Sequence, residues 1–237
     1  MTPLVLIPGM MCDARLWGPL PDALARRMVI HAPCTEADSV PALAAALLAD
    51  APPRFHLAGL SMGGIVAMEV VRQAPERVER LALLDTNPFA ETDAVRQRRP
   101  PQIARALAGD LAGVMREEMK PHYLAPGPRN QAVLDLCLAM ALALGPEVFA
   151  RQSHALSTRP DQCDALAAYP GPALVLMGRH DRLCPLDRHE TMHRLLPASR
   201  LVIIEEAGHL PTLEQPEATW AALLAWSEGS GGAQHPA

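Results

Sequence analysis

The chain has 237 residues, of which 49% are hydrophobic and 20% charged, enough to build a full core in one domain with an added subdomain. A formal net charge of -5 gives no electrostatic basis for binding nucleic acid or an anionic membrane surface. No apolar stretch reaches membrane-spanning length, and the N-terminus lacks the pattern of a secretory signal, so a cytoplasmic protein is expected.

Short apolar runs alternate with helical stretches along most of the chain. Strands are predicted at residues 4–7, 28–30, 55–58, 81–84, 173–177 and 201–204. Helices are predicted at 42–49, 62–74 and 216–227, and prolines or glycines follow each of them. Continuous apolar strands that alternate with helices are typical of a mostly parallel sheet covered by helices on both faces, which is the α/β fold class.

The segment Gly59-Leu60-Ser61-Met62-Gly63 places one serine between two glycines, directly after a predicted strand and directly before a predicted helix. Such an abrupt change strains the backbone at the serine and crowds the residues two positions away, where glycine relieves the crowding. The Ser61 hydroxyl should then project above the sheet, near the Met62 amide at the helix N-terminus. The pattern predicts a nucleophile elbow; the alternative is a serine that only caps the helix.

Between residues 87 and 169 the alternation gives way to helical periodicity alone, in pieces such as 111–120 and 130–144 that prolines separate. Helices inserted at the carboxyl edge of a parallel sheet lie over the place where ligands bind. We interpret this segment as a cap that excludes water from a reactive serine, the alternative being a subdomain that only stabilises the fold. Residues 1–86 and 170–228 would form the core, and the glycine-rich residues 229–237 a disordered tail.

Two polar clusters follow the last two predicted strands. Asp181 ends the cluster GRHD after the fifth strand, and His209 ends the cluster EEAGH after the sixth. A serine nucleophile needs an imidazole that takes and returns its proton, and a carboxylate that orients this imidazole. The order Ser61, Asp181, His209 is the chain order expected when the serine lies on an elbow.

At four places the chain resembles the α/β-hydrolase family: LIPGMMCDARLW near the start, GLSMGG at 59–64, GRHDRLCP at 178–185 and AGHLPTLEQPE at 207–217. The resemblance implies the α/β-hydrolase fold, with Ser61 as nucleophile, His209 as general base and acid, and Asp181 as orienting acid. It also implies an oxyanion hole formed by the backbone amides of Met62 and Met10. Its serine mechanism requires no metal, nucleotide or flavin, and no cofactor is expected.

Asp85 is a second candidate for the acid, because it ends the fourth predicted strand and some members of the family place the carboxylate there. In the sequence LDTNP, however, a helix or turn cap explains an aspartate adequately. We therefore prefer Asp181. His180 precedes the acid, and we expect it at the surface or behind the reacting groups.

The segment His189-Glu190-Thr191-Met192-His193 matches H-E-x-x-H, in which two histidines one helical turn apart bind zinc. Pro197 ends its helix, and the helix has an ordinary place between the fifth and sixth strands. We expect its polar residues to face solvent, away from the catalytic edge, and predict no metal. The five cysteines form no C-x-x-C pair, so neither a disulfide framework nor a cysteine zinc site is expected at Cys12, Cys34, Cys137, Cys163 and Cys184.

The sequence thus predicts a capped serine hydrolase that cleaves a small carboxylic ester or related acyl compound through an acyl-serine intermediate. Three alternatives stay open: hydrolysis or lyase chemistry at a carbon-carbon bond, a receptor that binds a small ligand without turnover, and a zinc peptidase. The expected partner is a small-molecule substrate, and the oligomeric state is left undetermined.

The sequence gives two hints about the substrate pocket. Apolar cap residues could line it, although a stripe at helical spacing is more often core: Met115, Met119, Leu136, Met140 and Leu142. Arg96, Arg98 and Arg99 could receive a substrate carboxylate, but a solvated run of charge is the more common meaning of such a pattern.

Overall fold

The computed structural model describes residues 1–119, 123–128 and 130–229. Its centre is a six-stranded sheet in the order β2-β1-β3-β4-β5-β6, in which each neighbouring pair is parallel. The strands are β1 (Leu4–Ile7), β2 (Val29–His31), β3 (Phe55–Leu60), β4 (Val78–Leu84), β5 (Ala173–Gly178) and β6 (Ser199–Ile204). The predicted α/β fold class is confirmed, and the tail predicted to be disordered lies outside the described residues from 230 onward.

The inner strands are buried on both faces, which explains why their sequences are continuously apolar. In β1, Val5 and Ile7 pack into one hydrophobic cluster, whereas Leu4 and Leu6 pack into the other. Successive side chains of a strand point to opposite faces, so one strand contributes residues to both hydrophobic clusters.

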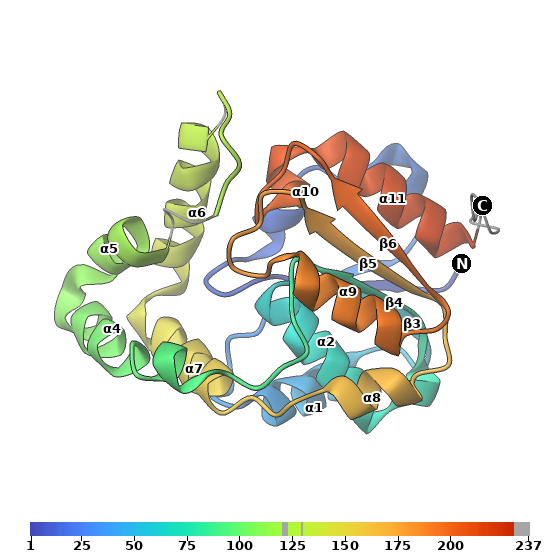
Figure 1. The fold of residues 1–237 in the computed structure, drawn as a ribbon, viewed down its shortest axis with the longest axis horizontal. Coiled ribbons are helices and arrows are strands. Elements are labelled where there is room, and N and C mark those ends of the chain that lie inside the picture. The colour runs from blue at the N-terminus through green and yellow to red at the C-terminus, as the bar shows by residue number, and fades with distance from the viewer. Residues whose placement is uncertain (120–122, 129, 230–237) are drawn as a thin grey trace.

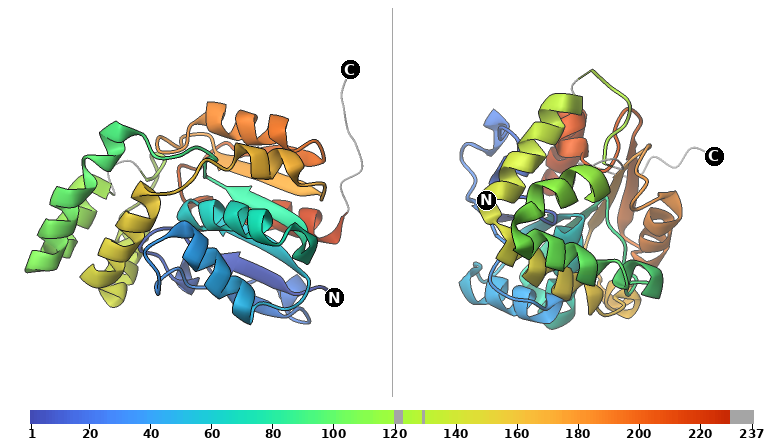
Figure 2. Two further views of the ribbon diagram at one scale, coloured as in Figure 1. Left: turned by 90° about the horizontal axis from the view of Figure 1, so that it is seen from below. Right: turned by 90° about the vertical axis from the view of Figure 1, so that its left-hand side faces the viewer.

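Helices cover both faces of this sheet (Figures 1 and 2). One face carries α1 (Val40–Asp50), α2 (Met62–Gln73), α8 (Cys163–Ala168) and α9 (Leu186–Leu195), and the other carries α11 (Pro216–Glu228) and the short η1 (Ala14–Trp17). The remaining short helices of the core are η2 (Asp22–Leu24), η3 (Pro75–Arg77) and α10 (Pro211–Glu214). The six strands and the helices α1, α2 and α11 are those predicted from the sequence, with ends shifted by up to three residues, whereas η1, η2, η3 and α10 were not predicted.

Most of the segment 87–169 forms a helical layer at the end of the sheet opposite the N-terminus (Figure 2). Its elements are α3 (Asp93–Arg96), α4 (Arg99–Arg105), η4 (Ala106–Asp110), α5 (Leu111–Val114), η5 (Met115–Met119), α6 (Asn130–Leu144) and α7 (Pro146–Ser157). The last helix in this range, α8, packs instead against α2 and α9 of the core.

The helix predicted at 111–120 consists of two parts, α5 and η5. Its start is set by Gly109, whose φ of 99° breaks the preceding helix, and by Asp110, which caps α5 by accepting the Gly113 amide at 3.1 Å. From Met115 to Met119 the turns are π-helical, and residue 120 lies outside the described part of the chain.

Among the described residues, no single helix has both the length and the apolar character needed to cross a membrane. Helices α6 and α7 meet these criteria only when they are taken together, and they are bent by 98° where they join.

Candidate active site

The turn from β3 to α2 has the strained geometry that the sequence predicted. Ser61 adopts a φ of 55° and a ψ of -116°, while its amide donates to the Leu84 carbonyl at 2.9 Å. A Cβ added to Gly59 would lie 2.2 Å from the carbonyl oxygen of Gly63, so no larger residue fits there without moving the backbone. The glycines therefore permit a serine conformation that is rare for any residue other than glycine.

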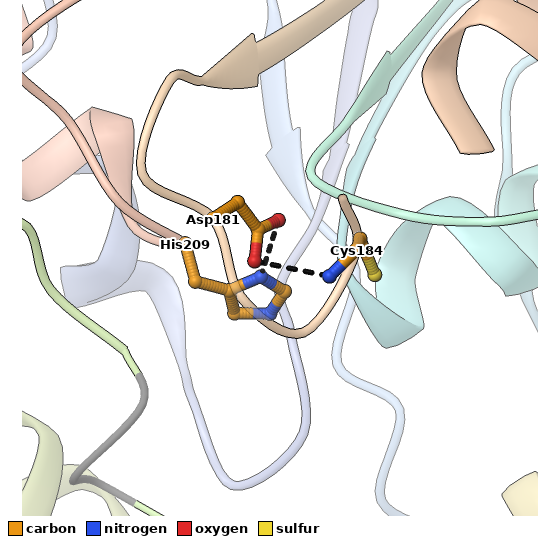
Figure 3. A group of neighbouring side chains, drawn as sticks. All are labelled: Asp181, Cys184 and His209. Carbon is orange, nitrogen blue, oxygen red and sulfur yellow. Dashed lines mark hydrogen bonds and ion pairs between the residues drawn. The ribbon is translucent and has the colours of Figure 1, made fainter. Parts of the chain in front are cut away.

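The structure brings Ser61, His209 and Asp181 together from three strand ends. The Nε2 atom of His209 lies 2.9 Å from the Ser61 hydroxyl, and its Nδ1 atom lies 2.9 Å from the Asp181 Oδ2 atom. Asp181 and His209 are buried, whereas Ser61 is partly exposed. Figure 3 shows the imidazole ring directed at the carboxylate. Proton transfer from the hydroxyl to Nε2 is therefore geometrically possible without rearrangement.

Asp181 is held in its orientation by the backbone as well as by the imidazole. Its Oδ1 atom accepts the amides of Leu183 and Cys184 at 2.8 and 3.0 Å, which leaves Oδ2 for His209. Burial opposes its charge, but the adjacent His209 and these amides lower the pKa of Asp181 below its ordinary value. The ionised form of Asp181 is therefore favoured beside His209.

Glu214 holds the loop that carries His209, a role that sequence reasoning missed. Its carboxylate accepts the amides of Gly208, Leu210 and Ala125 at 2.9, 3.0 and 2.8 Å. The signal was present in the matched segment AGHLPTLEQPE, where an acidic residue on a buried helix follows the histidine by five positions. The carboxylate supplies hydrogen-bond acceptors that these buried amides would otherwise lack.

Asp85 does not contact His209. Its side chain does not cap a helix or a turn either, so the interpretation of Asp85 as a cap was wrong. It is completely buried, has a φ of 44°, and accepts the Gly178 amide at 2.9 Å across the ends of β4 and β5. Burial, together with the nearby Asp181 carboxylate, raises the pKa of Asp85 well above its ordinary value. The neutral form of Asp85 is therefore favoured beside the Asp181 carboxylate.

Met10 and Met62 line the cavity beside Ser61, and the backbone amide of neither donates to another described residue. An oxyanion formed on a substrate could accept hydrogen bonds from these two amides, one at the start of α2 and one after β1. The Met10 loop is itself anchored: Met11 has a φ of 55°, and its amide donates to the Gln152 Oε1 atom at 2.8 Å. Gln152, which is buried in α7, also donates to the Cys34 carbonyl at 2.7 Å. No sequence pattern indicates this anchor.

Ser61 opens into a cavity of about 330 Å³ between the core and the helical layer. Of the five apolar residues considered for its lining, only Met119 reaches it. Met115 and Met140 are buried in the core, Leu136 packs against it, and Leu142 is exposed. The expectation that an apolar stripe at helical spacing is usually part of the core therefore holds for Met115 and Met140.

Arg98 and Arg99 also line this cavity, together with Arg159 and the acid Glu91. Arg99 donates two hydrogen bonds to Glu91, at 2.5 and 2.6 Å, and Arg159 donates a third at 2.8 Å. Arg96 points elsewhere and pairs with Asp93. The interpretation of 96–99 as a solvated charged run therefore fails for Arg99, whose side chain is only 11% exposed.

The H-E-x-x-H helix corresponds to α9, but its first histidine does not face solvent, which corrects the prediction. His189 is completely buried, and its Nε2 atom accepts the Thr86 amide at 3.3 Å beside the catalytic edge. His193 contacts the Ser199 hydroxyl instead. In the part of the chain that the structure describes, the one group of side chains able to share a metal ion is Asp181, Cys184 and His209, and it includes none of the H-E-x-x-H residues. His180 is exposed, as expected.

Comparison with known proteins agrees with this geometry. A model of the α/β hydrolase family matches residues 4–222. The chain belongs to the α/β hydrolase family. A pimeloyl-[acyl-carrier protein] methyl ester esterase of Klebsiella pneumoniae is 29% identical, over 94% of this chain and 92% of the relative. Its counterpart in Aeromonas hydrophila is 27% identical over 90% and 91%.

Solved structures show the same architecture over nearly the whole chain. A malate-bound thermophilic esterase from Thermogutta terrifontis has a TM-score of 0.86 and 27% identity, covering 97% of this chain and 90% of the other. An enol-lactonase from Burkholderia xenovorans, at 19% identity and a TM-score of 0.84 over 96% and 92%, shares the fold. The chain is an enzyme, an α/β-fold hydrolase that cleaves a small ester or related acyl compound.

Proposed function

We propose that Ser61 is the nucleophile of this esterase, His209 its general base and acid, and Asp181 the acid that orients the imidazole. The observation that carries the proposal is the continuous chain of contacts from the Ser61 hydroxyl through His209 to Asp181, at the wall of a cavity large enough for a small ester. Asp181 is preferred to Asp85 for the orienting role because the Asp85 carboxylate accepts the Gly178 amide instead of a hydrogen bond from His209.

In the first half of the reaction, His209 Nε2 takes the Ser61 proton while the serine oxygen attacks the ester carbonyl. The negative oxygen of the tetrahedral intermediate accepts hydrogen bonds from the Met10 and Met62 amides. His209 then gives its proton to the leaving alcohol, and the acyl group remains on Ser61. In the second half, water repeats the sequence, releasing the carboxylic acid and restoring the serine.

The helical layer has a part in this proposal. Met119, Leu156 and Arg159 come from it and from the loop after α7, and they line the same cavity as Ser61. We propose that the helical layer of the segment 87–169, from α3 to α7, acts as a cap that encloses the acyl chain and limits access of water. The enzyme would act on short esters such as methyl esters, which is the class of bond named for the curated relatives. Its five cysteines form no disulfide, which supports a cytoplasmic location.

A fluorophosphonate probe tests the nucleophile directly, because it reacts with an activated serine. The native chain should be labelled once, and Ser61→Ala should lose both labelling and hydrolysis of short p-nitrophenyl esters. Ser153 is a matched control, because it is a serine buried in the helical layer away from the cavity; Ser153→Ala should keep both. Labelling that persists in Ser61→Ala contradicts the proposal, and turnover of diketones but of no ester would favour carbon-carbon chemistry.

A further inference from the structure

The lining of the catalytic cavity carries an excess of positive charge. Three arginines line the cavity, Arg98, Arg99 and Arg159, against two acids, Glu91 and Glu118. The formal charge of the lining is therefore +1, in a chain whose net charge is -5. The rest of the lining is mostly apolar and includes Ile65, Leu156 and Leu210.

The buried acid Glu91 cannot neutralise this positive charge alone. Its side chain is 1% exposed, and it pairs with both Arg99 and Arg159, whose side chains are each 11% exposed. One carboxylate thus faces two guanidinium groups that are largely removed from water. Within the described residues, Arg99 Nη1 and Arg159 Nη2 make no hydrogen bond, so each group keeps donors to spare.

Arg98 adds a third positive charge without a partner in the described part of the chain. The other acid of the lining, Glu118, is already held by Gln102 at 2.7 Å and by Arg105 at 3.3 Å. A purely structural ion pair would need one arginine for Glu91. The second largely buried arginine is explained by an anion that completes the cluster, and Arg98, whose side chain is exposed, adds positive charge at the same cavity.

We propose that the substrate is a small ester with a second, ionised carboxyl group, and that Arg98, Arg99 and Arg159 receive this carboxylate while Ser61 attacks the ester carbonyl. The inference rests on the proposed function and names its substrate class. A guanidinium presents paired N–H donors that match the two oxygens of a carboxylate. The apolar residues of the lining accommodate the methylene groups that separate the two carboxyl groups.

Paired substrates test the assignment without altering the enzyme. Monomethyl esters of dicarboxylic acids from malonate to adipate would be compared with the corresponding dimethyl esters, which differ only in the second charge. O-acetyl hydroxy acids, whose carboxylate lies on the alcohol side, would be compared with their methyl esters. We expect kcat/KM to favour the charged form by at least about tenfold in one of these series, with a maximum at one chain length and a decline as salt is added.

Variants then locate the subsite. Arg98→Gln should lower kcat/KM for the charged ester by more than it changes kcat/KM for the uncharged ester, and so remove most of the preference. Arg99→Lys keeps the charge opposite Glu91 but loses the forked geometry, and should lower the preference as well. Arg116 is the matched control: it is exposed on η5, does not line the cavity, and its change to Gln alters the net charge equally. Arg116→Gln should leave the preference intact.

Binding measurements on an inactive variant distinguish failure of this inference from failure of the proposed function. In Ser61→Ala, calorimetry with a dicarboxylate and with its monomethyl ester should show binding that Arg98→Gln weakens, whether or not the native enzyme turns the ester over. Turnover of both ester forms at equal rates, or a preference unchanged by Arg98→Gln and Arg99→Lys, overturns the subsite and leaves the esterase proposal standing. Absence of turnover on every ester, with arginine-dependent dicarboxylate binding, overturns the esterase proposal alone.

Discussion

Asp181→Asn should almost abolish turnover, and the structure shows which way the new amide will face. Asp181 Oδ1 accepts two backbone amides, from Leu183 and Cys184, whereas Oδ2 accepts one hydrogen bond from His209. The carbonyl oxygen of an asparagine would keep the two backbone donors. The opposite orientation would leave both N–H groups buried without an acceptor, at about 1–3 kcal/mol each.

The NH2 group of the asparagine therefore points at His209 Nδ1, which must then accept a hydrogen bond. This places the imidazole proton on Nε2, facing Ser61, so the ring can no longer take the serine proton. A wrong tautomer of this kind lowers kcat by about ten thousandfold in serine proteases, equivalent to about 5 kcal/mol. We expect a loss of that order in kcat on a short p-nitrophenyl ester, with KM nearly unchanged.

Asp85→Asn is the matched control. Burial, followed by the nearby Asp181 carboxylate, raises the pKa of Asp85 well above its ordinary value, which favours the neutral carboxyl. Asparagine is neutral too, and its oxygen can accept the Gly178 amide in the same way. Activity should fall by less than about tenfold, and urea unfolding should show that both variants are folded. A larger loss in Asp85→Asn than in Asp181→Asn would refute the argument and move the orienting role to β4.

Three further outcomes follow from the contacts around the site. Gly63→Ala should lower the free energy of unfolding by about 1–3 kcal/mol or more in urea titrations, because its new Cβ would lie 2.1 Å from the Ile7 carbonyl oxygen and only backbone movement can relieve the overlap. Gln152→Leu removes the acceptor of the Met11 amide and the donor to the Cys34 carbonyl; it should lower kcat more than it raises KM, and an unchanged kcat would mean that Gln152 does not fix the oxyanion loop. Burial lowers the pKa of His189 to about 4, below its ordinary value of 6.5, so the unfolded chain binds a proton that the folded chain excludes. The stability from this neutral histidine is complete above about pH 6.5 and is lost as the pH falls toward 4, by about 2 kcal/mol at pH 5. His189→Gln should reduce the fall in unfolding free energy between pH 7 and pH 5 by that amount, and an unchanged pH slope would show that His189 is not the group responsible.

The parts of the site that could be predicted from sequence lie at the carboxyl ends of strands. A parallel sheet brings those ends to one edge, so Ser61, Asp181 and His209 could be placed together although they are far apart in the chain. Local pattern sufficed because each of the three follows a recognisable apolar run. The strain at Ser61 also followed from local sequence, since glycines at 59 and 63 are required by the turn itself.

The errors arose where a residue's role depends on what packs against it. Asp85 was interpreted as a cap because the LDTNP pattern suits one, whereas its partner is Gly178 at the end of the neighbouring strand. His189 was placed on a solvent-facing helix surface, yet it is the residue through which α9 contacts the Thr86 amide. Periodicity identifies the faces of a helix but not the depth at which each face is buried.

The cationic lining of the cavity shows the same limit more clearly. Arg99 belongs to a run of arginines that composition alone marks as solvated, and its meaning changes only because Glu91 and Arg159 lie beside it. Glu91 and Arg159 are 68 positions apart, on segments with no strand end to align them. The hydrolytic chemistry is therefore encoded in short patterns at the sheet edge, whereas substrate selection is encoded in the way the helical layer folds over it. This is why the sequence could predict the reaction but not the second charged group that we propose the substrate carries.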